Sequence, residues 1–83
     1  MSNNNTMEII IPNQGLTLTE VVIVKWYKKI GETVQKDETL LNFETDKADM
    51  ELPSPANGIL SKIVVEEGST IAIGGVVGII TLT

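Results

Sequence analysis

The sequence of 83 residues contains no cysteine, no histidine and no arginine, so all six of its basic residues are lysines. Without cysteine, neither disulfides nor thiolate metal sites can hold the chain together. Because histidine is missing too, the chain lacks the usual zinc ligands and the Cys or His nucleophile–base pairs of many enzymes. We therefore expect no metal site and no self-contained catalytic centre of these kinds.

Charge is also unbalanced, with 11 acidic residues against 6 basic ones and a formal net charge of −5. The lysines form no basic patch with aromatic platforms, which argues against nucleic-acid binding. No apolar run approaches the roughly 20 residues of a membrane helix, and the N-terminus resembles neither a secretory nor a mitochondrial signal. The sequence predicts a cytoplasmic domain whose acidic surface suits solubility and attraction to a basic partner.

The pattern of apolar residues predicts a small all-β domain. Hydrophobic residues make up 42% of the chain, and the many Val and Ile among them favour strands. Short runs separated by Gly, Pro and Asn, with no helical period, are typical of a sandwich or barrel. Polar residues 1–6 are expected to be flexible and residues 7–83 to form the domain. The strand candidates are 7–11, 21–27, a short one at 34, 40–45, 50–52, 59–65, 70–73 and 76–82.

The sequence also contains an internal repeat. When it is shifted by 37 residues, Gly31 meets Gly68, Thr33 meets Thr70, and apolar positions such as Phe43 and Ile80 coincide. Such a repeat indicates two half-domains of about four strands that bury each other's apolar faces. The position equivalent to residue 47 falls beyond the C-terminus, so that residue and the chain ends are expected at opposite ends of the domain.

Lys47 lies in a polar break between two strand candidates, where we expect a tight hairpin turn. The carboxylates of Glu44, Asp46, Asp49 and Glu51 surround it. They would keep its ammonium protonated, which is unsuitable for a catalytic base or a Schiff-base nucleophile. Lys47 is thus either an ordinary solvated charge or a residue that another enzyme modifies.

The segment Glu44–Ala48, Glu-Thr-Asp-Lys-Ala, resembles the attachment motif of the lipoyl domains of 2-oxo acid dehydrogenase complexes. Gly31 lies 16 residues before Lys47 and Gly58 lies 11 after it, which is the spacing in that family. Residues 26–34 and 53–58 resemble the segments that flank the motif there, and the similarity extends from about residue 7 to 81. From the sequence we interpret Gly31, Gly58 and Gly68 as turn glycines.

The resemblance implies a flattened barrel or sandwich of two four-stranded antiparallel sheets with quasi-two-fold symmetry, of the hammerhead type. It further implies that (R)-lipoic acid is joined to Lys47 through an amide, and that Asp46 and Ala48 place this lysine for the modifying enzyme. The residues implied in partner recognition are Glu44 and the first-loop residues Asn13, Gln14, Gly15, Leu16 and Thr17.

The partners implied by the resemblance form a reaction cycle. A lipoate ligase or octanoyl transferase modifies the lysine, and a thiamine-dependent 2-oxo acid dehydrogenase component reductively acylates the dithiolane. The acyltransferase core then transfers the acyl group to coenzyme A, and dihydrolipoamide dehydrogenase reoxidises the arm. The chain is expected to be a monomeric, non-catalytic part of a dihydrolipoamide acyltransferase. Its end at Thr83 fits a piece of such an enzyme, and pyruvate is favoured because such domains are common.

Three alternatives remain beside this interpretation. A biotin carrier has the same fold, but its lysine lies between methionines, where this chain has Asp46 and Ala48. The lipoyl protein of glycine cleavage is longer and has additional helical segments. An unmodified adaptor domain would leave Lys47 as a plain turn charge. Two departures from the lipoyl pattern, Gln14 and Val21, affect the first loop and its exit and bear on partner recognition.

Overall fold

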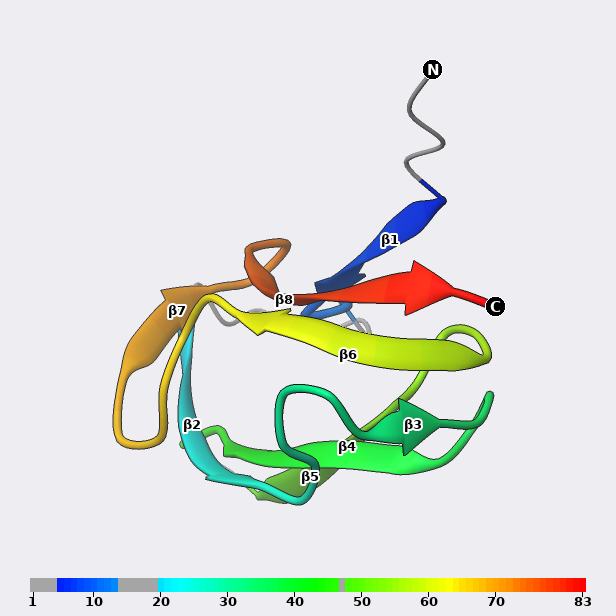
Figure 1. The fold of residues 1–83 in the computed structure, drawn as a ribbon. Coiled ribbons are helices and arrows are strands. Elements are labelled where there is room, and N and C mark those ends of the chain that lie inside the picture. Colours follow the sequence, from blue (N-terminus) through cyan, green and yellow to red (C-terminus); the bar gives the residue numbers. More distant parts are fainter. Residues whose placement is uncertain (1–4, 14–19, 47) are drawn as a thin grey trace.

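The computed structural model describes residues 5–13, 20–46 and 48–83, which form eight strands in two antiparallel four-stranded sheets (Figure 1). One sheet has the order β1-β8-β6-β3 and the other β5-β4-β2-β7. The predicted all-β architecture is confirmed, and each predicted strand is present with small shifts at its ends. The bounds are β1 (Thr6–Ile10), β2 (Glu20–Trp26), β3 (Thr33–Val34), β4 (Thr39–Glu44), β5 (Asp49–Pro53), β6 (Gly58–Ile63), β7 (Thr70–Ala72) and β8 (Val76–Leu82). No helix in the described ranges is long and apolar enough to cross a membrane.

The two sheets are related by the predicted quasi-two-fold symmetry. Exchanging β1 with β5, β8 with β4, β6 with β2 and β3 with β7 converts one strand order into the other. The symmetry extends to individual hydrogen bonds. The Thr45 N–H donates to the Ala48 carbonyl (2.8 Å), and the Leu82 N–H, at the equivalent position of the repeat, donates to the Asn5 carbonyl (2.7 Å). The chain ends therefore occupy the place equivalent to the β4–β5 turn.

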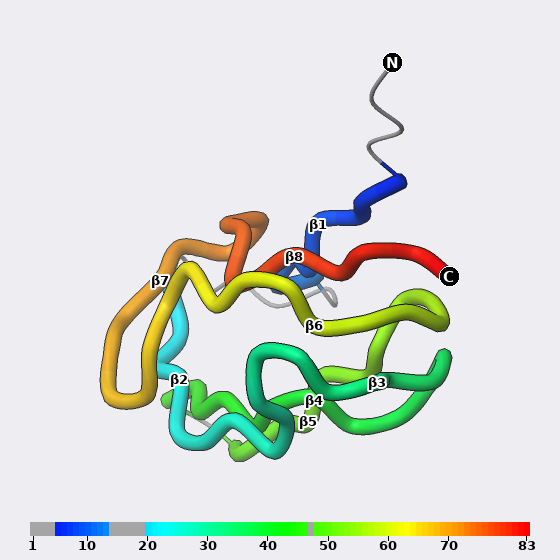
Figure 2. Tube along the Cα trace, in the orientation of Figure 1, coloured from blue at the N-terminus to red at the C-terminus, as the bar shows by residue number. Residues whose placement is uncertain are grey.

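This symmetry separates the β4–β5 turn from the chain ends. In Figures 1 and 2 the turn lies at the left of the molecule, whereas the start of β1 and the C-terminus lie at the right. The predicted placement of these features at opposite ends of the domain is confirmed. A tether attached at the chain ends would leave the turn pointing away from it.

The core is a single apolar layer between the sheets. Alternation along the strands sends every second side chain inward, as with Leu41 and Phe43 in β4. Trp26 is half-buried and packs against this layer, and its indole N–H donates to the Val65 carbonyl at 2.9 Å. The buried cluster consists of Ile9, Ile11, Val21, Ile23, Val34, Leu40, Leu41, Phe43, Leu52, Leu60, Val77 and Ile80.

Bulges occur at equivalent points of the two halves. The pairing of β2 with β4 passes over Val24, and that of β6 with β8 passes over Ser61, 37 positions later. Leu40 and Val77 are passed over in the same way and are fully buried. Because a bulge bends a strand and increases its twist, these positions allow each sheet to curve around the common core.

The glycines predicted at turns behave in two different ways. Gly31 and Gly68 have φ angles of +95° and +86° in equivalent turns, so the turn interpretation is correct for them. It is wrong for Gly58, which begins strand β6 and pairs with Leu82. A Cβ atom there would collide with the Thr81 carbonyl oxygen and lie 2.5 Å from Cγ2 of Ile80. Gly58 is therefore required by close strand packing and not by turn geometry.

We predict that Gly58→Ala destabilises the domain by about 2–3 kcal/mol, because the added methyl group must push apart two paired strands. Gly68→Ala meets open space and should cost only about 1 kcal/mol for its positive φ. Urea unfolding of both variants measures the difference. An equal or smaller loss for Gly58→Ala would contradict the role given to close packing.

Candidate functional site

The β4–β5 hairpin forms the site that the sequence singles out. The two strands pair up to Glu44 opposite Asp49, and residues 45–48 connect them. The turn is closed by the Thr45 N–H, which donates to the Ala48 carbonyl at 2.8 Å. Phe43, just before the turn, is buried in the core, so the base of the turn is anchored in the rigid part of the domain.

The side chain of Thr45 closes the turn a second time. Its hydroxyl donates to the Ala48 carbonyl at 3.0 Å and accepts the Ala48 N–H at 3.0 Å. Thr45 is only 9% exposed. Our sequence analysis expected a tight turn here but did not single out Thr45. The available signal was a hydroxyl side chain at the start of the turn, since Ser and Thr hydroxyls bond to nearby backbone groups.

Lys47, the predicted attachment residue, lies outside the described residues. Its neighbours Asp46 and Ala48 are described and both are exposed. The contacts between Thr45 and Ala48 leave Asp46 and Lys47 as the two residues that connect them. The structure thus defines the turn residues on either side of this lysine.

Carboxylates surround the turn as the sequence suggested. Glu44, Asp46, Asp49 and Glu51 are all exposed, and Glu44 lies directly opposite Asp49 in the ladder. Like charges at directly opposed positions destabilise a sheet, so folding does not account for this arrangement. Within the described ranges no group of three or more acidic side chains could hold a metal ion. The carboxylates are better suited to attracting a positively charged surface.

A small hollow of about 290 Å³ lies beside the turn. It brings Glu44, one of the predicted recognition residues, together with the exit of the first loop at Glu20. Val21, which departs from the lipoyl pattern, is 2% exposed and contributes to the core. Asn13 is exposed at the start of the loop. The hollow is lined by Glu20, Val21, Val22, Glu44, Thr45, Asp46 and Thr70; the predicted loop residues Gln14, Gly15, Leu16 and Thr17 lie outside the described residues.

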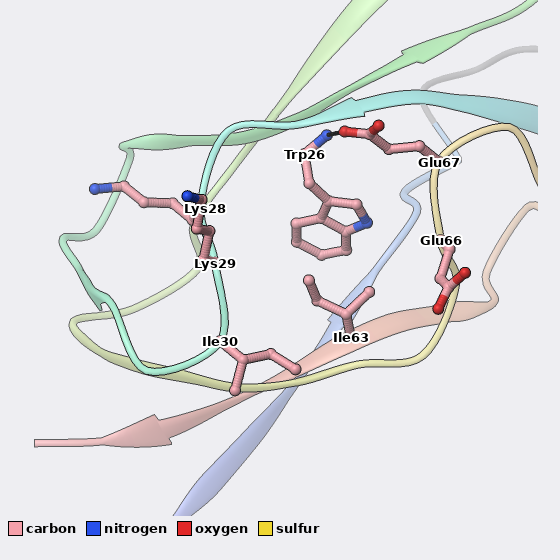
Figure 3. A pocket seen from close by; sticks show the side chains of 7 residues that line it. All are labelled: Trp26, Lys28, Lys29, Ile30, Ile63, Glu66 and Glu67. Atoms are coloured by element: carbon pink, nitrogen blue, oxygen red, sulfur yellow. Dashed lines mark hydrogen bonds between the residues drawn. The ribbon is translucent and has the colours of Figure 1, made fainter.

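A larger hollow of about 670 Å³ lies where the ends of β2 and β6 approach each other. Figure 3 shows Trp26 facing Ile63 in its centre, and these two residues are equivalent in the repeat. Lys28, on the wall of this hollow, forms an ion pair with Glu38, with Nζ 2.7 Å from the carboxylate oxygen Oε2. This hydrogen bond lowers the pKa of the Glu38 carboxyl. The Glu67 carboxylate accepts a hydrogen bond from the backbone N–H of Trp26 at 2.9 Å. The hollow thus lies between equivalent residues of the two halves, and the described residues that line it include no Ser, Thr or Cys nucleophile.

Comparison with protein families and sequences gives a consistent result. A biotin/lipoyl family model described as "Biotin-requiring enzyme" matches residues 7–80. The succinyltransferase component of the 2-oxoglutarate dehydrogenase complex of Rickettsia typhi is 45% identical over 73 residues, which cover 88% of this chain. The acetyltransferase component of the pyruvate dehydrogenase complex of Corynebacterium glutamicum is 46% identical over 70 residues, or 84% of this chain. The matches span only 18% and 10% of the lengths of these two relatives.

Solved structures with the same fold include the lipoyl domain of the 2-oxoglutarate dehydrogenase complex of Azotobacter vinelandii. It is 32% identical with a TM-score of 0.68, and the match covers 92% of this chain and 94% of that domain. A single-chain, multi-domain long-chain acyl-CoA carboxylase matches with a TM-score of 0.79 over all of this chain and 8% of its own. Its identity of 14% makes this a likeness of fold alone.

Proposed function

This chain belongs to the lipoyl domains of the biotin/lipoyl family, and from that membership we propose that Lys47 carries (R)-lipoic acid in an amide bond. The domain would act as the carrier of a 2-oxo acid dehydrogenase complex and form part of a longer dihydrolipoamide acyltransferase. The observation that supports this best is the closed turn between Thr45 and Ala48, which lies at the end of the domain remote from the chain ends.

Lipoate is favoured over biotin by the residues beside the lysine. Asp46 and Ala48 match the lipoyl motif, whereas biotin carriers have methionine at both positions. The family model covers both kinds of attachment, so this preference rests on the two neighbours and on the likeness to a lipoyl domain at 32% identity. Both neighbours are exposed, as required of side chains that a modifying enzyme must contact.

The residues around the turn determine how attachment would proceed. A lysine amine is protonated at neutral pH, so the modifying enzyme has to remove a proton before Nζ can attack. The lone pair of Nζ then bonds to the carbonyl carbon of an activated lipoyl donor, and the activating group, AMP in the case of a ligase, leaves with the bonding electrons. Once attached, the dithiolane would accept an acyl group together with two electrons and deliver the acyl group to coenzyme A.

The domain itself would supply position and tethering. A tether at the chain ends raises the local concentration of the arm at each active site without any new contact. Attachment removes one positive charge from a chain of net charge −5, so the region around Glu44 and Asp46 becomes more acidic. We propose a basic docking surface on the thiamine-dependent dehydrogenase component, which electrostatic attraction would bring to this end of the domain.

The remaining partners are proposed on the same ground. A lipoate ligase or octanoyl transferase would install the group, the acyltransferase core would take the acyl group, and dihydrolipoamide dehydrogenase would reoxidise the arm. We expect the isolated domain to be a monomer and to work in the cytoplasm. Our sequence reasoning favoured pyruvate, but relatives from 2-oxoglutarate and pyruvate complexes match at 45% and 46% identity, so the proposal includes both acids.

We predict that incubation with a lipoate ligase, ATP and lipoate adds one lipoyl group to the wild-type domain. Intact mass and peptide mapping should place it on Lys47, and Lys47→Arg should remain unmodified although five other lysines are present. A matched lipoyl domain treated in parallel confirms that the ligase is active. An unmodified wild type would favour the adaptor role, and modification by a biotin ligase would favour a biotin carrier.

A second prediction concerns the acylating partner. The lipoylated domain is mixed with a pyruvate or a 2-oxoglutarate dehydrogenase component, and acetyl or succinyl increments are followed by mass. We expect one component to acylate it at least about tenfold faster than the other, as a specific docking site requires.

Glu44→Gln tests the acidic region in this assay. It should slow acylation by the preferred component severalfold, because it removes a charge beside the arm. Glu8→Gln, an exposed carboxylate on the other sheet, is the matched control and should have no effect. Equal rates for wild type and Glu44→Gln would contradict a role for Glu44 in docking.

A further inference from the structure

We propose that Thr45 is a positioning residue for the modification of Lys47. Its hydroxyl fixes Thr45 and Ala48 relative to each other, and so sets the two ends of the short segment on which a modifying enzyme acts. This inference deepens the proposed function and rests on it. The chemistry itself remains the attack of Nζ on an activated acyl donor, with loss of a proton from the amine and departure of the activating group.

Three hydrogen bonds join Thr45 to Ala48. The Thr45 N–H donates to the Ala48 carbonyl (2.8 Å), the Thr45 hydroxyl donates to the same carbonyl (3.0 Å), and the Ala48 N–H donates to the hydroxyl oxygen (3.0 Å). In an ordinary two-residue hairpin the two closing residues exchange backbone bonds only. Here the Thr45 hydroxyl accepts the Ala48 N–H, so this one side chain fixes the separation between Thr45 and Ala48.

Burial strengthens this clamp. Thr45 is 9% exposed, in a turn whose neighbours Asp46 and Ala48 are exposed. A hydrogen bond removed from water is costly to leave unmade, so the Ala48 N–H holds its partner firmly. The hydroxyl is therefore a fixed part of the turn and not a solvated side chain.

The expected consequence is for the rate of attachment and not for binding. The modifying enzyme would contact exposed side chains such as that of Asp46, which a change at Thr45 leaves in place. Amide formation needs the amine and the acyl carbon in a near-attack arrangement, and misplacement by about 1 Å can cost a hundredfold in rate. Loss of the clamp should therefore lower kcat while KM stays near its wild-type value.

The chain provides a matched control at Ser54. This residue is 1% exposed, and its hydroxyl donates to the Ala56 carbonyl (2.7 Å) and accepts the Ala56 N–H (3.4 Å). Ser54 follows Pro53, the last residue of β5, and so lies at the end of that strand away from the lysine turn. Removing its hydroxyl breaks the same kind of clamp where no modification is proposed.

The experiment compares Thr45→Val, Thr45→Ser, Thr45→Ala and Ser54→Ala, each first shown to be folded by urea unfolding. Thr45→Val keeps the shape of the side chain without its hydroxyl, and Thr45→Ala is the second variant should the valine form not fold. We expect kcat of lipoylation to fall roughly tenfold to a hundredfold in Thr45→Val. Thr45→Ser should restore wild-type kcat, and Ser54→Ala should match the wild type in kcat despite a similar loss of stability.

A second readout does not depend on the ligase. Amide hydrogen exchange at Ala48 should be at least about tenfold faster in Thr45→Val than in the wild type, since its acceptor is gone, and exchange at Ala56 should be unchanged. Wild-type kcat in a folded Thr45→Val domain, or an equal slowing in Ser54→Ala, would overturn the proposal. Faster exchange at Ala48 together with an unmodified wild type would refute the proposed lipoylation and leave the clamp as a feature of the fold.

Discussion

The apolar layer enclosed between two four-stranded sheets is the constraint on which the rest of this structure depends. A sheet with one apolar face must bury that face against another layer, so each half needs the other. The equivalent bulges at Leu40 and Val77 bend both sheets around this layer, and both residues are fully buried. Because Phe43 is anchored in the layer, the turn that follows it starts from a rigid base.

The proposed function of the domain depends on the features at its two ends, which are the chain ends and the β4–β5 turn. Symmetry puts the chain ends at the place equivalent to the β4–β5 turn, so the tether and the proposed attachment residue are separated by the length of the sheets. At the turn the chain accepts an unfavourable pair of like charges, Glu44 opposite Asp49. Recognition by several enzymes in succession explains why a carrier keeps these two opposed carboxylates, whereas the stability of the fold does not.

Much of this could be predicted from sequence because the determining signals are local or repeated. The pattern of apolar residues and turn residues identified the strands, and the 37-residue repeat identified which strands of the two half-domains are equivalent. Gly58 was misread because Gly after Pro, Ser and Asn is typical of a turn, whereas its real constraint comes from Thr81, which is distant in sequence. A hydroxyl at the start of the turn was a local signal for Thr45. The sequence does not show, however, that this side chain becomes buried and bonds to both backbone groups of Ala48.

The central claim is that position within the closed turn, and not mere exposure, selects Lys47 for modification. The most direct test exchanges the two residues at the turn in the double variant Asp46→Lys, Lys47→Asp, which preserves composition, charge and the contacts between Thr45 and Ala48. Lipoylation is then followed by peptide mapping. We expect the relocated lysine to be modified at least about a hundredfold more slowly than the wild-type residue. Modification at the wild-type rate would contradict the account.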